Sequence, residues 1–330
     1  MHGQFLWYEL TSPDPSAAKK FYPKFTDWGT MPFDKDYTLW TTGGQPHAGL
    51  FTLTDEMRSQ GVPPNWLGYV EVDDVDKTAN LAKSLGATLM HGPMDVPEVG
   101  RFAVLQDPQG PVFGLYKTTT GSVGWDGTPV VGRMSWHELM TPDHNKAFEF
   151  YRKLFGWEKM GEMDMGDGLM YLIFGKGEAM YGGMFSMTGE FANMHPFWLY
   201  YVHVKDVPKA VAAAKKAGAQ LHKGPMDIPG GVIAILGDPQ GAGFALHHLS
   251  PTEEPQKAAT KKAAPKKAAP KKATKKAAVK KAVVKKTTPK KAAKKKAPVK
   301  KKTAKKAKPK KAAKKKSPKR ATPRRSAKRK

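Results

Sequence analysis

An internal repeat constrains this chain of 330 residues more than any other feature, because two long stretches match at a separation of 129 to 132 residues. ELTSPD at 9–14 matches ELMTPD at 138–143, and YVEVDDV at 69–75 matches YVHVKDV at 201–207. GPMDVP at 92–97 matches GPMDIP at 224–229, and DPQG occurs at 107–110 and again at 238–241. Self-similarity at a fixed period is typical of repeated structural units. The sequence therefore predicts two tandem copies of one domain, at 1–118 and 131–249, joined by a linker at 119–130.

Within each copy, strand and helix periodicities alternate. An opening strand, at 4–10 or 133–139, stops at a Pro-Asp turn, where Asp14 and Asp143 are placed to cap the helix that follows. Two short strands come next, at 37–42 and 48–53 in the first copy. The second half of each copy repeats strand, helix and strands, and its helix closes at Gly86 or Gly218, where glycine permits a left-handed residue. We therefore predict an α+β fold in which each domain is a pair of βαβββ units.

The charge of the chain is divided between two regions of opposite sign. Residues 1–250 carry 20 Lys and Arg against 27 Asp and Glu, whereas residues 251–330 carry 36 against 2. These counts give −7 for the repeats and +34 for the segment after them. All Trp, Tyr, Phe and Met residues lie in the first 250 positions, so we expect a hydrophobic core to form only there.

Cysteine is absent, which excludes disulfides, thiolate nucleophiles and Cys-based zinc sites. The first residues lack the basic start and the apolar run of a signal peptide, and no apolar stretch approaches the roughly 20 residues that span a bilayer. We expect a cytoplasmic protein without membrane insertion.

The repeated motifs resemble those of the vicinal oxygen chelate (VOC) superfamily, which includes glyoxalase I, bleomycin-resistance proteins and extradiol dioxygenases. The resemblance is carried by the strand–Pro-Asp–helix opening with Phe-Tyr in the helix, by the V-x-V-x-D-V start of the second unit, and by the DPQG turn before the last strand. It covers about 1–118 and 131–249. It implies two tandem VOC domains, each a curved sheet whose concave face forms a pocket for a small molecule or a metal.

The positions that the resemblance assigns to metal ligands carry unsuitable side chains. They are Trp7, Leu67 and Gly114 in the first copy and Trp136, Leu199 and Ala245 in the second, and none of these side chains can ligate a metal. We therefore expect no cofactor, and we do not expect standard metal-dependent glyoxalase or dioxygenase activity.

Strand alternation predicts which side chains share the concave face with these positions, because residues two apart on a strand point the same way. An aromatic-lined pocket with one or two ionisable groups suits a flat or hydroxylated organic ligand. The predicted pocket residues are Trp7, Glu9, Tyr69, Glu71 and Tyr116 in the first copy, and Trp136, Glu138, Tyr201, His203 and His247 in the second.

Three further interpretations concern individual residues. Glu138, His203 and His247 could form a displaced divalent-metal site. The alternatives are ordinary hydrogen-bonding roles in a pocket and a purely structural or solvent-exposed placement. Glu9 or Glu138 could act as a general base if burial raises its pKa, or could simply be hydrogen bonded. His47 could project into the first pocket, although a polar residue near a hairpin turn is more often solvated.

The segment 250–330 consists of irregular KKAAP and KKAT units and contains no aromatic residue. It cannot bury enough apolar surface to offset the entropy of ordering, so we predict a disordered tail. Its composition resembles the tails of linker histones and of bacterial histone-like proteins, with S/T-P-basic-basic motifs that imply DNA contacts and phosphorylation. The basic residues of these motifs are Lys290, Lys291, Lys319, Arg320, Arg324 and Arg325, and the phosphate acceptors are Thr288, Ser317 and Thr322. We expect the tail to bind DNA or RNA without sequence specificity.

Three functions follow, in order of preference. The first is a protein that binds a small organic ligand and associates with the nucleoid or chromatin through its tail. The second is a VOC-type enzyme, a lyase, isomerase or hydrolase acting on a small carbonyl or aromatic compound, which the tail localises. The third is an architectural DNA compactor whose repeats form a homodimer. The sequence leaves open whether the tail docks on the acidic repeats.

Overall fold

The computed structural model describes residues 2–119, 129–166 and 168–249. Most of the expected linker and the whole expected tail, with its basic motifs and phosphate acceptors, lie outside these residues. The predicted domain boundaries and the nucleic-acid contacts of the tail therefore stay predictions.

The first repeat builds one eight-stranded sheet in the order β2-β3-β4-β1-β5-β8-β7-β6. The central strand β1 is parallel to β4 and antiparallel to β5, and β5 is parallel to β8, so the two βαβββ units meet between β1 and β5. Its elements are β1 (Phe5–Ser12), α1 (Pro15–Phe21), η1 (Tyr22–Lys24), β2 (Trp28–Pro32), β3 (Tyr37–Thr42), β4 (Gln45–Thr52), α2 (Asp55–Ser59), β5 (Asn65–Glu71), α3 (Val75–Ser84), β6 (Thr88–Val96), β7 (Gly100–Gln106) and β8 (Val112–Thr118).

The second repeat forms a matching sheet in the order β10-β11-β12-β9-β13-β16-β15-β14. Its elements are β9 (Met134–Thr141), α4 (His144–Phe155), β10 (Glu158–Asp164), β11 (Met170–Lys176), β12 (Ala179–Ser186), η2 (Gly189–Phe191), β13 (Phe197–His203), α5 (Val207–Lys216), β14 (Gln220–Ile228), β15 (Gly231–Gly237) and β16 (Gly243–Leu249). The predicted α+β fold, with one curved sheet for each repeat, is confirmed.

Helix capping follows the sequence prediction. The Asp14 carboxylate accepts a hydrogen bond from the amide of Ala17 at 3.0 Å, and that of Asp143 accepts from two amides of the first turn of α4 at 3.1 Å. These bonds satisfy amides that have no partner within the helix. Gly86 and Gly218, just beyond α3 and α5, have φ values of 99° and 104°, in the left-handed region that glycine tolerates.

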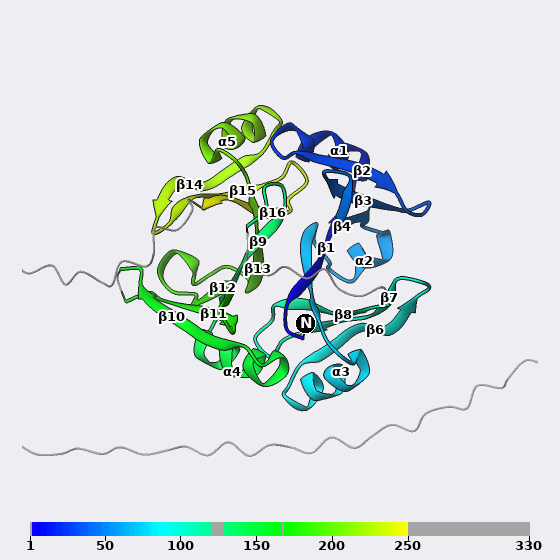
Figure 1. Ribbon diagram of the computed structural model, residues 1–330, viewed down its shortest axis with the longest axis vertical. Helices are drawn as coiled ribbons and strands as arrows, with labels where there is room; N and C mark the ends of the chain where they lie inside the picture. The colour runs from blue at the N-terminus through cyan, green and yellow to red at the C-terminus, as the bar shows by residue number, and fades with distance from the viewer. Residues whose placement is uncertain (1, 120–128, 167, 250–330) are drawn as a thin grey trace, which may run out of the picture. The chain divides into compact units, whose positions relative to one another are not determined.

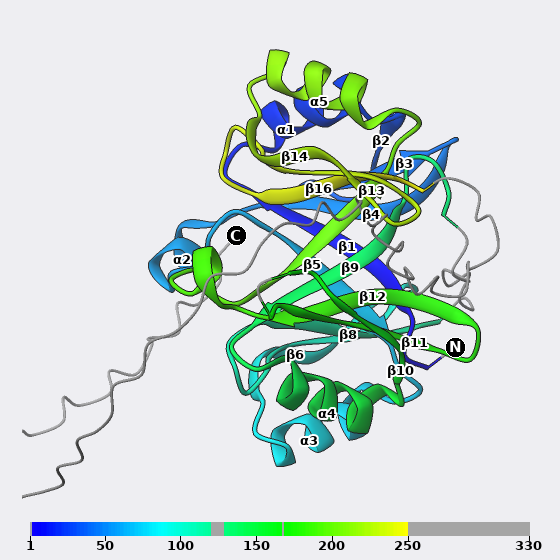
Figure 2. The same cartoon turned by 90° about the vertical axis from the view of Figure 1, so that its left-hand side faces the viewer.

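The two sheets lie back to back, with β1, β5, β9 and β13 in the middle of the molecule (Figure 1). Helices α1 and α5 lie together at one end, and α3 and α4 lie together at the other, as both views show (Figure 2). The concave faces of the sheets therefore point away from each other. We call the outward face of β1–β8 the first cup and that of β9–β16 the second cup.

One continuous hydrophobic core fills the space between the sheets. At its centre the Phe5 ring stacks on His137 with 3.8 Å between ring centroids, and the Tyr8 hydroxyl lies 2.6 Å from His137 Nε2. The Tyr200 hydroxyl accepts a hydrogen bond from the amide of Gly68 at 2.7 Å, and a Cβ at Gly68 would lie 2.5 Å from the Tyr200 ring. Tyr8 matches His137 in the repeat, and Gly68 matches Tyr200, so the interface uses one large ring where two would collide.

The DPQG turns hold the two repeats together. Asp107 of the first turn accepts a hydrogen bond from the Tyr151 hydroxyl of α4 at 2.9 Å, and Trp198 donates to the same hydroxyl at 3.1 Å. The second turn repeats this arrangement, because Asp238 accepts from the Tyr22 hydroxyl at 3.1 Å. Gln109 and Gln240 also bond across the interface to the backbone at Asp143 and Asp14. The motif therefore connects each repeat to the helix of the other.

Two kinds of element are not predicted from the sequence. The edge strands β2 and β10 were not located, because stretches such as Trp28–Pro32 bury only their first residue and show no alternation. The five-residue helix α2 was also missed, and it buries no side chain. Within the described residues, no helix is both long and apolar enough to cross a membrane.

Candidate functional site: two cups with half-buried glutamates

The floor of the first cup holds a half-buried glutamate between two tyrosines. Tyr37 and Tyr69 donate their hydroxyl hydrogens to the two carboxylate oxygens of Glu9, at 2.6 and 2.5 Å. Trp7 donates its indole N–H to the Tyr37 hydroxyl at 3.1 Å. Each group is therefore fixed by a neighbour from a different strand, β1, β3 or β5.

The second cup contains the same network. Tyr171 and Tyr201 donate to the two carboxylate oxygens of Glu138, both at 3.0 Å, and Trp136 donates to the Tyr171 hydroxyl at 2.9 Å. The repetition of four side chains with the same connectivity shows that these positions act as a unit in both cups.

Burial controls the protonation of both glutamates. Loss of solvent raises the pKa of Glu9 and of Glu138 above the ordinary value for glutamate, while the tyrosine hydrogen bonds act in the opposite direction. Lys223 also lowers the pKa of Glu138 through its charge. Burial and the adjacent carboxyl raise the pKa of Tyr171 and Tyr201, so both hydroxyls remain donors at neutral pH. A carboxyl of this kind can accept a hydrogen bond from a ligand hydroxyl or exchange a proton with it.

Among the residues that strand alternation assigns to the concave faces, Glu9, Glu138, Tyr69, Tyr201 and both tryptophans take part in these networks. Tyr37 and Tyr171 were missed, although they complete the network. Each tyrosine pairs in register with a phenylalanine, and its ring leans over the glycine two residues away on the next strand. A Cβ at Gly49 or Gly183 would lie within 2.1 Å of the tyrosine ring or hydroxyl that covers it.

The far end of each cup differs between the repeats. Glu71 pairs in register with Tyr116 in the first cup, whereas His203 pairs with His247 at the matching positions of the second. His247 Nε2 lies 2.6 Å from the Ser135 hydroxyl, and burial lowers the pKa of His247 to about 3. Burial also lowers the pKa of His203, which borders a groove between η1 and α5. Both imidazoles are therefore neutral at physiological pH.

The structure does not bring Glu138, His203 and His247 together as a metal site. Glu138 pairs in register with Leu199, four residues from His203 along the same strand, which corresponds to about 13 Å. No group of three or more His, Cys, Asp or Glu side chains among the described residues is arranged to hold a metal ion. The alternative metal centre is therefore not supported.

The positions that the family resemblance assigns to metal ligands do not fit a metal either. Trp7 pairs with Tyr69, and Tyr69 pairs with Gly114, on the cup face. The Tyr69 ring covers Gly114, since a Cβ there would lie 2.1 Å from the ring. An aromatic ring thus occupies the space above this position.

His47 is a correction to the sequence interpretation, because it neither enters the first cup nor lies in solvent. A register shift between Trp40 and Thr41 interrupts the alternation of β4 at this point. The imidazole packs on Trp28 in the core, with 5.0 Å between ring centroids, and is 6% exposed. Burial lowers the pKa of His47 to about 3, so it behaves as a neutral core residue.

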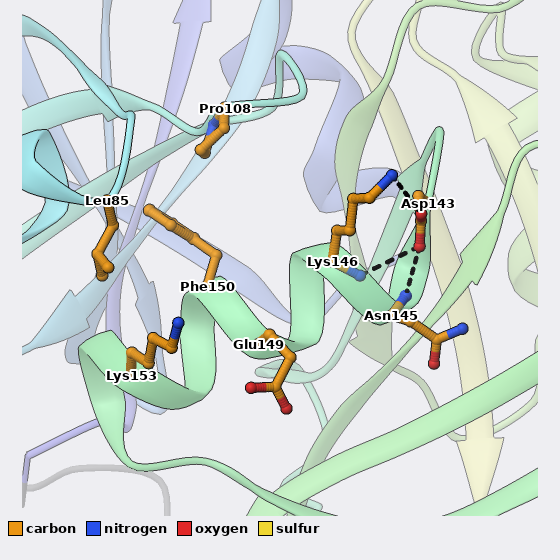
Figure 3. A pocket seen from close by; sticks show the side chains of 8 residues that line it. All are labelled: Leu85, Pro108, Asp143, Asn145, Lys146, Glu149, Phe150 and Lys153. Atoms are coloured by element: carbon orange, nitrogen blue, oxygen red, sulfur yellow. Dashed lines mark hydrogen bonds and ion pairs between the residues drawn. The ribbon is translucent and has the colours of Figure 1, made fainter.

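A groove between the repeats offers a weaker candidate (Figure 3). Leu85 and Pro108 form one wall, and the polar side chains of α4 form the other. Asp143 caps α4 and forms an ion pair with Lys146 at 3.0 Å. Glu149 forms an ion pair at 2.8 Å with Arg152, which does not line the groove. Because its carboxylates already have partners, we assign the candidate site to the cups.

Comparison with known proteins is consistent with this architecture. The profile of the Glyoxalase/Bleomycin resistance protein/Dioxygenase superfamily matches residues 133–246. CFP32 of Mycobacterium tuberculosis, named as a candidate glyoxylase, is 30% identical over 256 residues, which cover 75% of this chain and 95% of CFP32. The chain belongs to this superfamily.

A further relative and two solved structures extend the comparison. The anthracycline biosynthesis protein DnrV of Streptomyces peucetius is 28% identical, with 75% of this chain and 94% of DnrV covered. The Mn(II)-bound glyoxalase of Novosphingobium aromaticivorans shares the fold at a TM-score of 0.51 and 15% identity, over 75% of this chain and 82% of its own. Homoprotocatechuate 2,3-dioxygenase of Brevibacterium fuscum, solved with 3,4-dihydroxyphenylacetate, has a TM-score of 0.55 and 14% identity over 77% and 83% of the two chains.

Proposed function

We propose that this superfamily member binds a small aromatic or hydroxylated molecule in its cups without a catalytic metal, and that its basic segment 251–330 holds it on DNA. The observation that carries the ligand proposal is the duplicated network around Glu9 and Glu138. A purely structural cup does not require a half-buried carboxyl at the same place in both repeats, because removing such a group from water is costly.

The chemistry of the network favours this class of ligand. Each glutamate oxygen accepts one tyrosine hydrogen bond and retains a second lone pair for a ligand hydroxyl. Half-buried Trp7 and Trp136 provide aromatic surface beside the carboxyl. The names of the relatives support an aromatic ligand, since one is a protein of anthracycline biosynthesis and one solved neighbour holds 3,4-dihydroxyphenylacetate.

Calorimetric titration of the full-length protein with 2-naphthol tests the ligand proposal. We expect the double substitution Glu9→Gln and Glu138→Gln to weaken binding at least tenfold, because glutamine replaces one acceptor oxygen with an amide donor. Glu149→Gln on α4 is the control and should leave the affinity unchanged. Undiminished binding by the double variant would refute the proposal.

An enzyme of the lyase, isomerase or hydrolase type is the second candidate, favoured by the raised pKa of Glu138. If Glu138 transfers a proton, Glu138→Gln removes turnover of a bound carbonyl compound while its binding persists, and NMR of the compound can follow both. Metal analysis of the purified protein separates the two candidates further. Stoichiometric divalent metal would contradict the metal-free proposal.

The charge of the basic segment supports the DNA proposal. Its formal charge of +34 would release counterions from DNA, so affinity should fall steeply with salt and depend little on sequence. Fluorescence anisotropy with a short DNA duplex should show binding by the full chain and loss of binding when residues 251–330 are removed. Tight binding by residues 1–250 would refute the assignment.

A further inference from the structure

We propose that the two cups select ligands of different charge, and that the first cup binds an aromatic ligand carrying a protonated amine at Glu71. This inference rests on the proposed ligand-binding function and names the ligand class of one cup.

The first cup contains two carboxyls on its floor. Strand register places Glu71 opposite Tyr116 and on the same face as Tyr69, which binds Glu9. Glu9 pairs in register with Leu67, four residues from Glu71 on β5, so the two carboxyls occupy different parts of the floor. Burial raises the pKa of Tyr116, and the charges of Glu71 and Glu9 add to this effect. Cup-facing positions on the strands of this sheet carry no lysine or arginine among the described residues.

Glu71 has an unused hydrogen-bonding atom. Its side chain is only 5% exposed, and its Oε2 atom has no hydrogen-bond partner in the described part of the chain. A buried acceptor without a donor is costly, and a buried charge without a partner is more so. An ammonium group supplies both a donor and a positive charge.

The second cup lacks this acidic end. The positions that match Glu71 and Tyr116 hold the neutral imidazoles of His203 and His247, and Lys223 acts on Glu138 through its charge. Its floor is also more apolar, because Met140 and Phe197 occupy the positions of Thr11 and Asn65. A cation therefore gains less binding free energy in the second cup than in the first.

Two probes of the same shape test the inference, 2-phenylethylamine, which is a cation at neutral pH, and 2-phenylethanol, which is neutral. Calorimetric titration of the full-length protein in about 0.15 M salt limits the influence of distant charges. We expect the amine to bind at least tenfold more tightly than the alcohol. Glu71→Gln should abolish this preference and leave the alcohol affinity within twofold, whereas Glu71→Asp, which keeps the charge, should retain most of it.

His203→Gln is the matched control in the second cup and should leave the preference intact. Persistence of the preference in Glu71→Gln, or its loss in His203→Gln, would overturn the inference, and thermal unfolding of each variant identifies any that fails to fold. Binding of 2-naphthol separates the two proposals. If 2-naphthol binds in the cups but the amine has no advantage, charge selection alone is wrong, and if no probe binds, both proposals fall.

Discussion

The two repeats differ on the inner faces of their sheets and agree on the outer faces. On the inner face, the repeats differ where they meet, because Tyr8 faces His137 and Tyr200 occupies the space above Gly68. On the outer face, the repeats agree, and Glu9 and Glu138 have the same three aromatic neighbours. An interface between similar halves cannot place two large side chains at one point, so its sequence must diverge there. The outer faces agree although they do not pack on each other within the chain, which is what the proposed ligand-binding role requires.

The largest expected effect is the loss of stability when an aromatic side chain of the inner face is truncated. Trp198→Ala removes a side chain that is 6% exposed and packed on Phe5 of the other repeat, with 5.6 Å between ring centroids. We expect a loss of about 3–5 kcal/mol in the free energy of unfolding, as for other buried aromatic truncations. Urea denaturation measures it. Trp136→Ala, on the outer face of the same sheet, should cost clearly less, and equal losses would contradict the separation of roles.

The free energy of unfolding should depend on pH through a buried carboxyl between the repeats, that of Asp107. Burial raises the pKa of Asp107 to about 6, whereas an unfolded aspartate titrates near 3.9. Between these two values the folded state holds the proton and the unfolded state does not, so this group favours folding at low pH and that advantage is lost as pH rises through about 6. The difference corresponds to roughly 3 kcal/mol.

Asp107→Asn should therefore flatten the pH dependence of unfolding between about pH 4 and 6. Denaturation curves at several pH values measure this, and Asp55→Asn on the surface corrects for removal of a charge. An unchanged slope in Asp107→Asn would show that Asp107 is ionised in the folded protein across this range.

The smallest effect on stability is expected on the outer face. Glu138→Gln keeps the shape of the side chain and removes a carboxyl whose raised pKa shows that its charged form is unfavourable there. We expect a change of less than about 1 kcal/mol, of either sign, because lost hydrogen bonds and relieved desolvation oppose each other. Denaturation under the same conditions as for Trp198→Ala gives a direct comparison. A loss as large as that of the core variant would make Glu138 a structural residue.

Local rules were sufficient for much of the fold and part of the site. The repeat predicted two sheets, the capping aspartates predicted where helices begin, and alternation of side chains assigned Glu9 and Glu138 to the cup face. These features depend on neighbours close in sequence or on a simple period of two. Edge strands such as β2 were not predicted, because they bury too little to show that period.

Tertiary structure decided what these residues contact. A register shift turned His47 into the core, and the close approach of neighbouring strands let Tyr37 and Tyr171 cover glycines and reach the glutamates. The DPQG turns, which the sequence showed only as a repeated motif, bind the helices of the opposite repeat. The sequence by itself determined the repeated units and the faces of their strands, because these follow from local periodicity. Only the packing of distant strands and repeats decided which side chains meet, because a contact depends on register and on the space its neighbours leave.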